Sequence, residues 1–517
     1  MLARVWSAAL VGIEAVKVGV EVDISGGLPG VVVVGLPDAA IQESKERVKA
    51  ALKNAGFTFP QRRVVVNLTP GDLRKEGSGF DLPIAVGVLL ASEQVGQPDV
   101  ESILFLGEVS LDGSLRPVTG VLPMAATAQC IGFTTLVVPA ANAREAALVQ
   151  GLRVYGFEHL SQVGAWLAGN AQFLPVQVDL AQELHTEVQT YPDLEDVKGQ
   201  AHARRALEIA AAGGHNLILV GPPGSGKTML ARRLPGILPP LSLEEALEVT
   251  KIHSVAGLLS QRQALVNQRP FRSPHHSASG PALIGGGSVP RPGEVSLASL
   301  GILYLDELTE FKRDVLEFLR QPLEDGHVTV SRARQTVAFP ARFTLVASTN
   351  PCACGYYGDP VQACTCTPRQ RQQYWGKLSG PLLDRIDLQV MVSRLQPEEI
   401  LQRPAGENSR TVAIRVQQAR ELAQIRLAEQ GNLRCNAQLQ PRHLRLWCQL
   451  NPKASSLLEG AIRRLGLSAR ASDRILKVAR TIADLAGDPS FELQERYVLE
   501  AIQYRSLDRL AGPAGLG

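Results

Sequence analysis

The 517-residue sequence lacks any apolar run of about 18 residues or more, the length at which a membrane-spanning helix becomes plausible. Acidic and basic residues interrupt its apolar N-terminus, and no small-residue cleavage site follows. We therefore expect no membrane span and no signal peptide, which favours a cytoplasmic protein. The excess of positive over negative charge is also small. A net charge of +3 does not indicate nucleic-acid binding by itself.

Cysteine is scarce as well, and seven cysteines in a chain of this length do not form a disulfide framework. Four of them lie in one short segment as two CxC pairs, which are Cys352, Cys354, Cys364 and Cys366. Four thiolates can complete a tetrahedral Zn²⁺ site, so we predict a structural zinc knuckle over residues 352–366. The CxC spacing is less usual than CxxC, and reduced cysteines without metal remain the alternative.

The length predicts several hydrophobic cores, and the overall fold class is predicted as α/β. Residues 1–170 alternate β-branched runs with helical stretches, which is typical of an α/β domain. Residues 171–192 have little apolar periodicity and are predicted to be a linker. Strands and helices alternate again over residues 193–395, whereas residues 396–517 have helical periodicity throughout and predict an all-α lid. The lid is relatively basic, which alone is typical of a solvated helical surface.

The clearest chemical motif is a P-loop that follows a predicted buried strand at residues 217–220 and leads into a helix. Its residues are Gly221, Pro222, Pro223, Gly224, Ser225, Gly226, Lys227 and Thr228. The glycines allow backbone N–H groups to surround phosphate oxygens, while Lys227 is expected to reach the β and γ phosphates and Thr228 to bind Mg²⁺. Strand, complete motif and helix together disfavour a glycine-rich turn without function. We therefore predict ATP and Mg²⁺ as cofactors.

Two later strands are predicted to end in residues that complete this chemistry. About eighty residues after the P-loop, an apolar strand ends in Asp306 and Glu307. We expect Asp306 to hold the Mg²⁺ shell and Glu307 to polarise the attacking water as general base, the roles of a Walker B pair. A third strand ends in Asn350, which we expect to orient the same water as sensor 1.

Arginines are also required, because charge develops on the transferred phosphoryl group. Arg385, which follows a predicted short helix, is the candidate arginine finger for the ATP of a neighbouring subunit. In the lid, Arg470 is the candidate sensor 2, with Arg474 one turn later as its rival. A surface ion pair is the alternative role for each arginine. A finger that acts between subunits requires a ring, so we predict a hexameric ATPase of the AAA+ class.

The motor and lid resemble the magnesium chelatase-like AAA+ family, and within it the bacterial competence group. The matching stretches are DVKGQAHARRALEIAAAGGHNLILVGPPGSGKT, RPFRSPHHSASGPALIGGG, PRPGEVSLASLGILYLDELTEF, SGPLLDRIDL and LSARASDRILKVARTIADL. They cover nearly the whole motor and lid. The resemblance implies a hexameric ATPase that moves along DNA and drives branch migration when incoming strands are incorporated during natural transformation.

Between the second and third motor strands, the sequence predicts a β-hairpin with its turn at residues 331–334. In related ring helicases such a hairpin projects into the pore, so Arg332 and Arg334 are expected to contact DNA phosphates. A solvated basic turn is nearly as plausible. A second pore loop is suggested by residues 269–276, whose adjacent His275 and His276 we do not interpret as a metal site.

The N-terminal domain resembles the proteolytic domain of Lon, through NLTPGDLRKEGSGFDLPIAVGVL and LGEVSLDGSLRPVTGVLPMAATA. That protease uses a serine activated by a lysine. In this sequence Gly79 occupies the serine position, Ser78 lies one residue away, and Leu122 occupies the lysine position. We therefore predict a scaffold without protease chemistry, used for assembly or DNA engagement.

Three other functions are alternatives to a DNA motor. The first is the motor subunit of a magnesium chelatase, against which the Lon-like domain and the cysteine knuckle both count. The second is an ATP-dependent protease, which the residues at the dyad positions disfavour. The third is a scaffold that only binds nucleotide, which the complete set of hydrolytic side chains makes improbable.

Overall fold

The computed structural model describes residues 1–96, 99–186, 191–260, 263–287, 290–332, 335–395, 406–428 and 433–505. The chain divides into two compact units. Unit 1 comprises Met1–Thr186, Ser242–Asn267 and Pro290–Pro292, and unit 2 comprises the remaining residues. Among the described residues, no helix combines the length and apolar character that crossing a bilayer requires.

Unit 1 is built on a seven-stranded mixed sheet with the order β3-β4-β2-β1-β5-β8-β9. In β4, Val64, Val66 and Leu68 are buried and alternate with more exposed residues, the period expected of a strand. The strands of this sheet are β1 (Leu2–Val11), β2 (Glu14–Ser25), β3 (Gly30–Val34), β4 (Arg63–Thr69), β5 (Ile103–Phe105), β8 (Thr135–Pro139) and β9 (Arg153–Phe157). The shorter strands of unit 1 are β6 (Glu108–Val109), β7 (Leu115–Arg116) and β13 (Arg291–Pro292).

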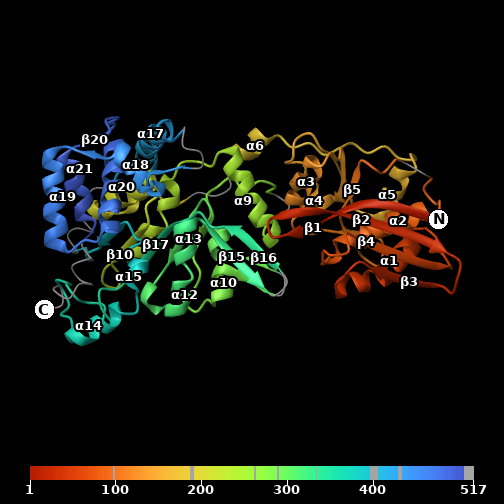
Figure 1. The fold of residues 1–517 in the computed structure, drawn as a ribbon, viewed down its shortest axis with the longest axis horizontal. Coiled ribbons are helices and arrows are strands. Elements are labelled where there is room, and N and C mark those ends of the chain that lie inside the picture. Colours follow the sequence, from red (N-terminus) through yellow and green to blue (C-terminus); the bar gives the residue numbers. More distant parts are fainter. Residues whose placement is uncertain are drawn as a thin grey trace. The chain divides into compact units, whose positions relative to one another are not determined.

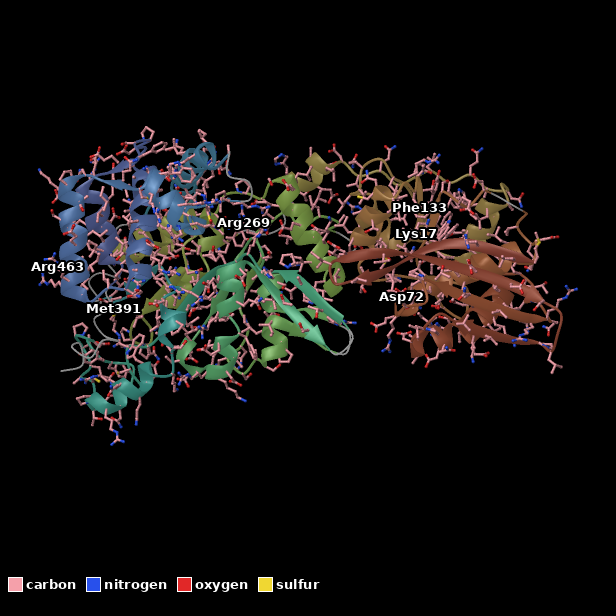
Figure 2. The ribbon with its side chains drawn as sticks, in the orientation of Figure 1. Lys17, Asp72, Phe133, Arg269, Met391 and Arg463 are labelled. Atoms are coloured by element: carbon pink, nitrogen blue, oxygen red, sulfur yellow. The ribbon has the colours of Figure 1, made fainter. Side chains whose placement is uncertain are left out.

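The sheet of unit 1 packs against helices, and Lys17 of β2 packs against two aromatic rings. The Lys17 Nζ lies 3.4 Å from the ring centroid of Trp6 and 4.9 Å from that of Phe133 (Figure 2). All residues of α2 are buried, consistent with its almost entirely apolar sequence. The helices are α1 (Ala39–Asn54), α2 (Asp81–Ala91), α3 (Val121–Cys130), α4 (Ala140–Ala146), α5 (Leu160–Leu167), α6 (Leu180–His185) and α9 (Leu243–Ala256).

Two segments of unit 1 lie outside residues 1–170. Helix α9, which follows the P-loop helix in sequence, packs against α3, and the Gly120 N–H donates to the Ser254 carbonyl over 3.1 Å. Phe173, from the stretch predicted to be a linker, packs against the core of this unit, and Val176 pairs with Val154. Unit 1 therefore includes residues 171–186 and a helical insertion from the motor sequence.

Unit 2 contains a five-stranded sheet with the order β11-β14-β17-β10-β18, in which all neighbouring strands are parallel. Its strands are β10 (Leu217–Val220), β11 (Phe271–Arg272), β14 (Ile302–Leu305), β17 (Thr344–Thr349) and β18 (Leu388–Met391). The strands predicted before the P-loop, the acidic pair and Asn350 are thereby confirmed. The remaining elements around this sheet are α7 (Ala201–Gly213), α8 (Lys227–Ala231), α10 (Gly280–Ile284), β12 (Gly285–Gly286), α11 (Glu294–Leu297), α12 (Arg313–Glu317), α13 (Arg320–Asp325), α14 (Pro368–Trp375) and α15 (Gly380–Leu383).

The predicted hairpin and the helical C-terminal region complete unit 2 (Figure 1). The antiparallel strands β15 (His327–Arg332) and β16 (Gln335–Pro340) confirm the hairpin. The C-terminal helices are α17 (Ser409–Leu427), α18 (Pro441–Trp447), α19 (Pro452–Leu465), α20 (Ala469–Leu485) and α21 (Glu495–Gln503). A two-residue parallel pair, β19 (Gln449–Leu450) with β20 (Glu492–Leu493), interrupts this otherwise helical region. Helices α17 and α20 both contact α7, so one hydrophobic core joins lid and sheet.

Candidate nucleotide-binding site

The P-loop, the acidic pair and Asn350 lie at one edge of the parallel sheet of unit 2. Strand β17 pairs with β10 on one side and with β14 on the other, with Thr349 opposite Val220 and Ala347 opposite Leu305. Because these strands are parallel, the residues that follow their carboxyl ends meet at the same edge. The structure thus brings together three motifs that are spread over the sequence between Gly221 and Asn350.

Lys227 closes the P-loop onto the end of β17. Its Nζ donates to the carbonyls of Gly221 and Pro222 over 2.7 and 2.9 Å, and to the Asn350 Oδ1 over 3.2 Å. Burial lowers the pKa of this amine, although the charges of Asp306 and Glu307 oppose the shift. A side chain at Gly221 could not be accommodated, because its Cβ would lie 2.1 Å from the Val392 carbonyl oxygen. The loop is therefore shaped by close backbone contacts, with its lysine beside the sensor candidate.

Thr228 and Asp306, the two predicted Mg²⁺ ligands, are hydrogen-bonded to each other. Two ligands of one metal ion are expected to be such close neighbours. The Thr228 Oγ1 donates to the Asp306 Oδ2 over 3.1 Å, and the Tyr304 hydroxyl donates to Thr228 Oγ1 over 3.1 Å. The Ser348 hydroxyl donates to the other carboxylate oxygen of Asp306. Burial alone would raise the pKa of Asp306, but hydrogen bonds led by that of Ser348 outweigh burial and lower it. Asp306 is thus kept as a carboxylate, the form that binds a divalent cation.

Tyr304 and Ser348 were not identified from the sequence, although both lie within two positions of a predicted site residue. Burial raises the pKa of Tyr304 to about 12, so its hydroxyl remains a donor at neutral pH. Ser348 lies on β17 beside β14, which carries the acidic pair. Strand pairing therefore supplies the signal that could have located both residues.

Glu307 adopts a left-handed backbone conformation, with φ of +52°. This conformation is uncommon for a residue other than glycine and marks a constrained position. Its N–H donates to the Asp306 Oδ1 over 3.1 Å and to the Ser348 Oγ over 3.3 Å, which ties the strained turn to the magnesium-site candidates. Its side chain is 58% exposed, and its Oε2 lies 3.8 Å from the His276 Nδ1. The carboxylate is thus available to a water molecule at the open edge of the site.

The four cysteines of the predicted knuckle lie together immediately after Asn350. Their sulfur atoms are all within 4.8 Å of one another, and three of the Sγ–Sγ distances are 3.3, 3.5 and 3.7 Å. Sulfurs bound to one tetrahedral zinc ion would be about 3.8 Å apart, given Zn–S bonds of about 2.3 Å. Burial raises the pKa of Cys352 to about 12 and also raises that of Cys366, whereas backbone N–H groups lower the pKa of Cys354 to about 5 despite its partial burial. Cys354 is thus the cysteine that most readily becomes the thiolate that metal binding requires. The cluster therefore fits a four-coordinate metal ion.

The knuckle also contacts the P-loop. At Gly355, with φ of +90°, an added Cβ would lie 2.9 Å from the Pro223 Cδ and 4.0 Å from the Asn350 Cγ. From the other side, the Arg394 Nη2 donates to the Pro223 carbonyl over 3.3 Å. The Trp375 Nε1 donates to the Pro351 carbonyl over 3.1 Å and anchors the start of the knuckle. A metal that fixes the knuckle would thus also support one wall of the nucleotide site.

The candidate arginines differ in their contacts. Arg385 is buried, with 7% of the residue exposed, and its guanidinium binds Glu324 and the Pro381 carbonyl rather than the P-loop. Arg474 forms an ion pair with Asp387, which is buried and also accepts the Asn216 N–H over 3.1 Å. Arg470 is exposed at the N-terminus of α20. Of the two lid arginines, Arg474 is thus occupied by a structural contact and Arg470 is accessible.

The predicted DNA contacts can be placed only in part. Arg332 ends β15, but its side chain and the whole of Arg334 lie outside the described residues. The hairpin below them is well packed, with Val328, Val330 and Phe339 buried. The rigid stem of the predicted DNA-binding element is therefore described, whereas its tip is not.

In unit 1, the residues at the Lon dyad positions do not form a serine–lysine pair. Ser78 begins the 3-10 turn Ser78–Phe80, and its hydroxyl donates to the Glu108 carboxylate. Leu122 is buried within α3. The lysine closest in sequence, Lys75, donates to the Pro70 carbonyl instead. The described contacts therefore provide Ser78 with a carboxylate but no amine.

Comparisons with known proteins match most of the chain. A family model described as magnesium chelatase, subunit ChlI, matches residues 193–400. Models described as subunit ChlI of Mg-chelatase and as its C-terminal part match residues 20–142 and 406–505.

Individual relatives agree with these matches. The competence protein ComM of Haemophilus influenzae is 45% identical over 515 residues, with 98% of each chain covered. The protein YifB of Salmonella typhimurium is 45% identical over 512 residues, again with 98% of each chain covered. The magnesium-chelatase 38 kDa subunit of Cereibacter sphaeroides is 26% identical over 171 residues, which cover 30% of this chain and 51% of that subunit.

Proposed function

We propose that this chain is a hexameric DNA motor. The premise is its family, because the chain belongs to the magnesium chelatase-like AAA+ family of the ComM and YifB proteins. In this proposal each subunit hydrolyses ATP and the ring drives branch migration of DNA during recombination of incoming strands. The motor acts in the cytoplasm and needs Mg²⁺. By function, we assign residues 1–170 to the scaffold domain, 193–395 to the ATPase core and 396–517 to the lid. The segment 171–192 was predicted to be a linker, and its residues 171–186 pack in unit 1.

One observation carries the ATPase part of this proposal. Lys227, Thr228, Asp306, Glu307 and Asn350 converge at one sheet edge, and each of the five is hydrogen-bonded to at least one of the others. In the proposed mechanism, Lys227 binds the terminal phosphates while Thr228 and Asp306 hold Mg²⁺. Glu307 accepts a proton from the attacking water, which Asn350 orients.

The contacts of Arg385 support assembly into a ring. Arg385, which matches an arginine finger, binds Glu324 and Pro381 of its own subunit. It lies before the amino end of β18, whereas the P-loop follows the carboxyl end of the neighbouring parallel strand β10. Its phosphate partner would therefore belong to the next subunit, where Arg385 stabilises charge in the transition state. Arg470 acts as sensor 2, and the four cysteines hold a structural Zn²⁺.

The DNA part rests on the full-length similarity to a competence protein. Arg332 and Arg334, at the tip of the hairpin, would grip phosphates within the ring, and unit 1 would serve assembly or DNA engagement without proteolysis. A magnesium chelatase motor is the second candidate, because the family model described as magnesium chelatase, subunit ChlI, matches residues 193–400.

The decisive experiment measures ATP hydrolysis and branch migration on one preparation, with a four-way junction, a fork and a single strand compared. We expect faster hydrolysis with DNA and migration of the junction. Lys227→Ala should abolish turnover, whereas Ser78→Ala, a change outside the nucleotide site, should leave it unchanged. Hydrolysis that no DNA alters would refute the DNA motor, and a lone monomer that hydrolyses ATP at full rate would refute the shared site.

A further inference from the structure

The Arg385 side chain is held in a conformation that a trans-acting finger must leave. Its Nη1 donates to the Pro381 carbonyl over 2.7 Å, and its Nη2 forms an ion pair with Glu324. Its Nε is buried and has no hydrogen-bond partner among the described residues. A buried donor without a partner is unfavourable, so this arrangement holds the guanidinium without satisfying it fully.

Glu324 lies opposite several basic side chains. The pKa of its carboxyl is lowered, first by the hydrogen bond from Arg385 and then by the charges of Arg385, Arg470 and Arg320. Two of these arginines are the candidate finger and the candidate sensor 2. Although it receives Arg385, the Glu324 side chain is 55% exposed. One accessible carboxylate thus attracts both arginines that the proposed mechanism assigns to phosphate.

A carboxylate and a phosphate compete for the same guanidinium, because both accept its planar pair of donors. The Glu324 carboxylate therefore binds the Arg385 guanidinium in the place of a γ-phosphate of the neighbouring subunit. Arg385 can move from one anion to the other by side-chain rotation, without loss of a charge partner. The exchange is favoured when the phosphate arrives or when Glu324 moves away.

Glu324 is also coupled to the hairpin that is predicted to contact DNA. It lies on α13, which leads through Gly326 into β15 (Figure 1). The Gly326 N–H donates to the Pro322 carbonyl over 3.0 Å, and its carbonyl accepts the Ala341 N–H over 2.9 Å. These bonds join the end of α13 to the base of both hairpin strands. A displacement of the hairpin would therefore be transmitted to Glu324.

We propose that Glu324 is a positioning residue that holds Arg385 on its own subunit and releases it when the hairpin engages DNA. Glu324 thereby makes hydrolysis in the neighbouring subunit depend on DNA, because Arg385 stays bound to Glu324 until the hairpin moves α13. This role rests on the proposed function, in which Arg385 is the finger.

The test compares steady-state ATP turnover of full-length protein at saturating ATP, with and without a four-way junction. Glu324→Gln keeps the shape of the side chain but removes its charge. We expect the rate without DNA to rise about fivefold, the scale of one partly exposed ion pair, while the rate with DNA changes less than about twofold. Stimulation by DNA should therefore fall about fivefold. Glu324→Asp, which restores the charge, should recover part of the stimulation.

Asp325→Asn is the matched control, since it removes one carboxylate from the next position of α13, where the side chain is exposed. It should leave stimulation by DNA unchanged. Equal effects of Glu324→Gln on both rates, or an effect shared with Asp325→Asn, would overturn the holding role and leave the proposed function intact. Arg385→Ala separates the two proposals, because turnover retained in that variant would refute the finger and, with it, the role of Glu324.

Discussion

The contact between the cysteine knuckle and the P-loop can be tested by adding one methyl group. Gly355 and Gly358 both belong to the loop between the two CxC pairs, and both have positive φ, +90° and +80°. A Cβ at Gly355 would lie 2.9 Å from the Pro223 Cδ, whereas a Cβ at Gly358 would have no heavy atom within 4 Å. Gly355→Ala and Gly358→Ala therefore share the backbone strain and differ in the clash.

The expected magnitudes follow from these two terms. A left-handed conformation costs an alanine about 1–2 kcal/mol, and both variants should lose this amount of stability. Overpacking adds about 1–3 kcal/mol at Gly355 alone. Pro223 cannot rotate its ring away, so we expect the P-loop to shift. A shift that costs about 1.4 kcal/mol of binding free energy weakens ATP affinity tenfold.

Equilibrium titration with a fluorescent ATP analogue, combined with thermal melting, checks both terms. Both variants should melt at lower temperature than the unmodified protein, while only Gly355→Ala should bind the nucleotide about tenfold more weakly. Equal nucleotide affinities in the two variants would show that the knuckle does not support the P-loop in solution.

Three further predictions concern the lid, the metal and pH. Arg470→Ala should slow turnover about a hundredfold at unchanged melting temperature. Arg474→Ala removes the arginine partner of the buried Asp387, which keeps the Asn216 N–H and His215 as neighbours, and should cost about 3–5 kcal/mol of unfolding free energy. The reverse pattern would make Arg474 the sensor. Cys364→Ser combined with Cys366→Ser should abolish bound zinc measured by mass spectrometry, and unchanged zinc would refute the knuckle. Burial lowers the pKa of His215 below its ordinary value of 6.5, so the unfolded chain binds a proton that the folded chain does not. The stability that the neutral His215 contributes is therefore complete above about pH 6.5 and falls at lower pH. We expect the midpoint of urea unfolding to be lower at pH 5.5 than at pH 7.5. Equal midpoints at the two pH values would contradict this prediction.

Much of the nucleotide site could be predicted because its motifs are local. Strand β10 begins and ends at the predicted residues, and the residues that follow three neighbouring strands do meet. The hairpin β15–β16 was likewise predicted from alternation and turn residues alone. Tyr304 and Ser348 were missed, because their hydroxyl groups become relevant only through the register of β14 with β17.

Other features depend on contacts between distant parts of the chain. The sequence predicts Arg385 as a candidate finger, but its pairing with Glu324 joins residues 61 positions apart. Helix α9 follows the P-loop helix in sequence and yet packs in unit 1, where the Ser254 hydroxyl donates to the buried Glu145. Neither contact has a periodicity or spacing that a sequence could display.

The sequence by itself determined which chemistry this protein carries, since phosphate-binding glycines, strand-end carboxylates and paired cysteines are recognised within short windows. Tertiary structure alone decided how these groups are restrained: Glu324 binds Arg385, Gly355 lies against the P-loop, and the buried Asp387 binds Arg474. The physical reason is that short motifs depend on local backbone geometry, whereas restraint depends on which distant side chains the packed core brings within a few ångströms.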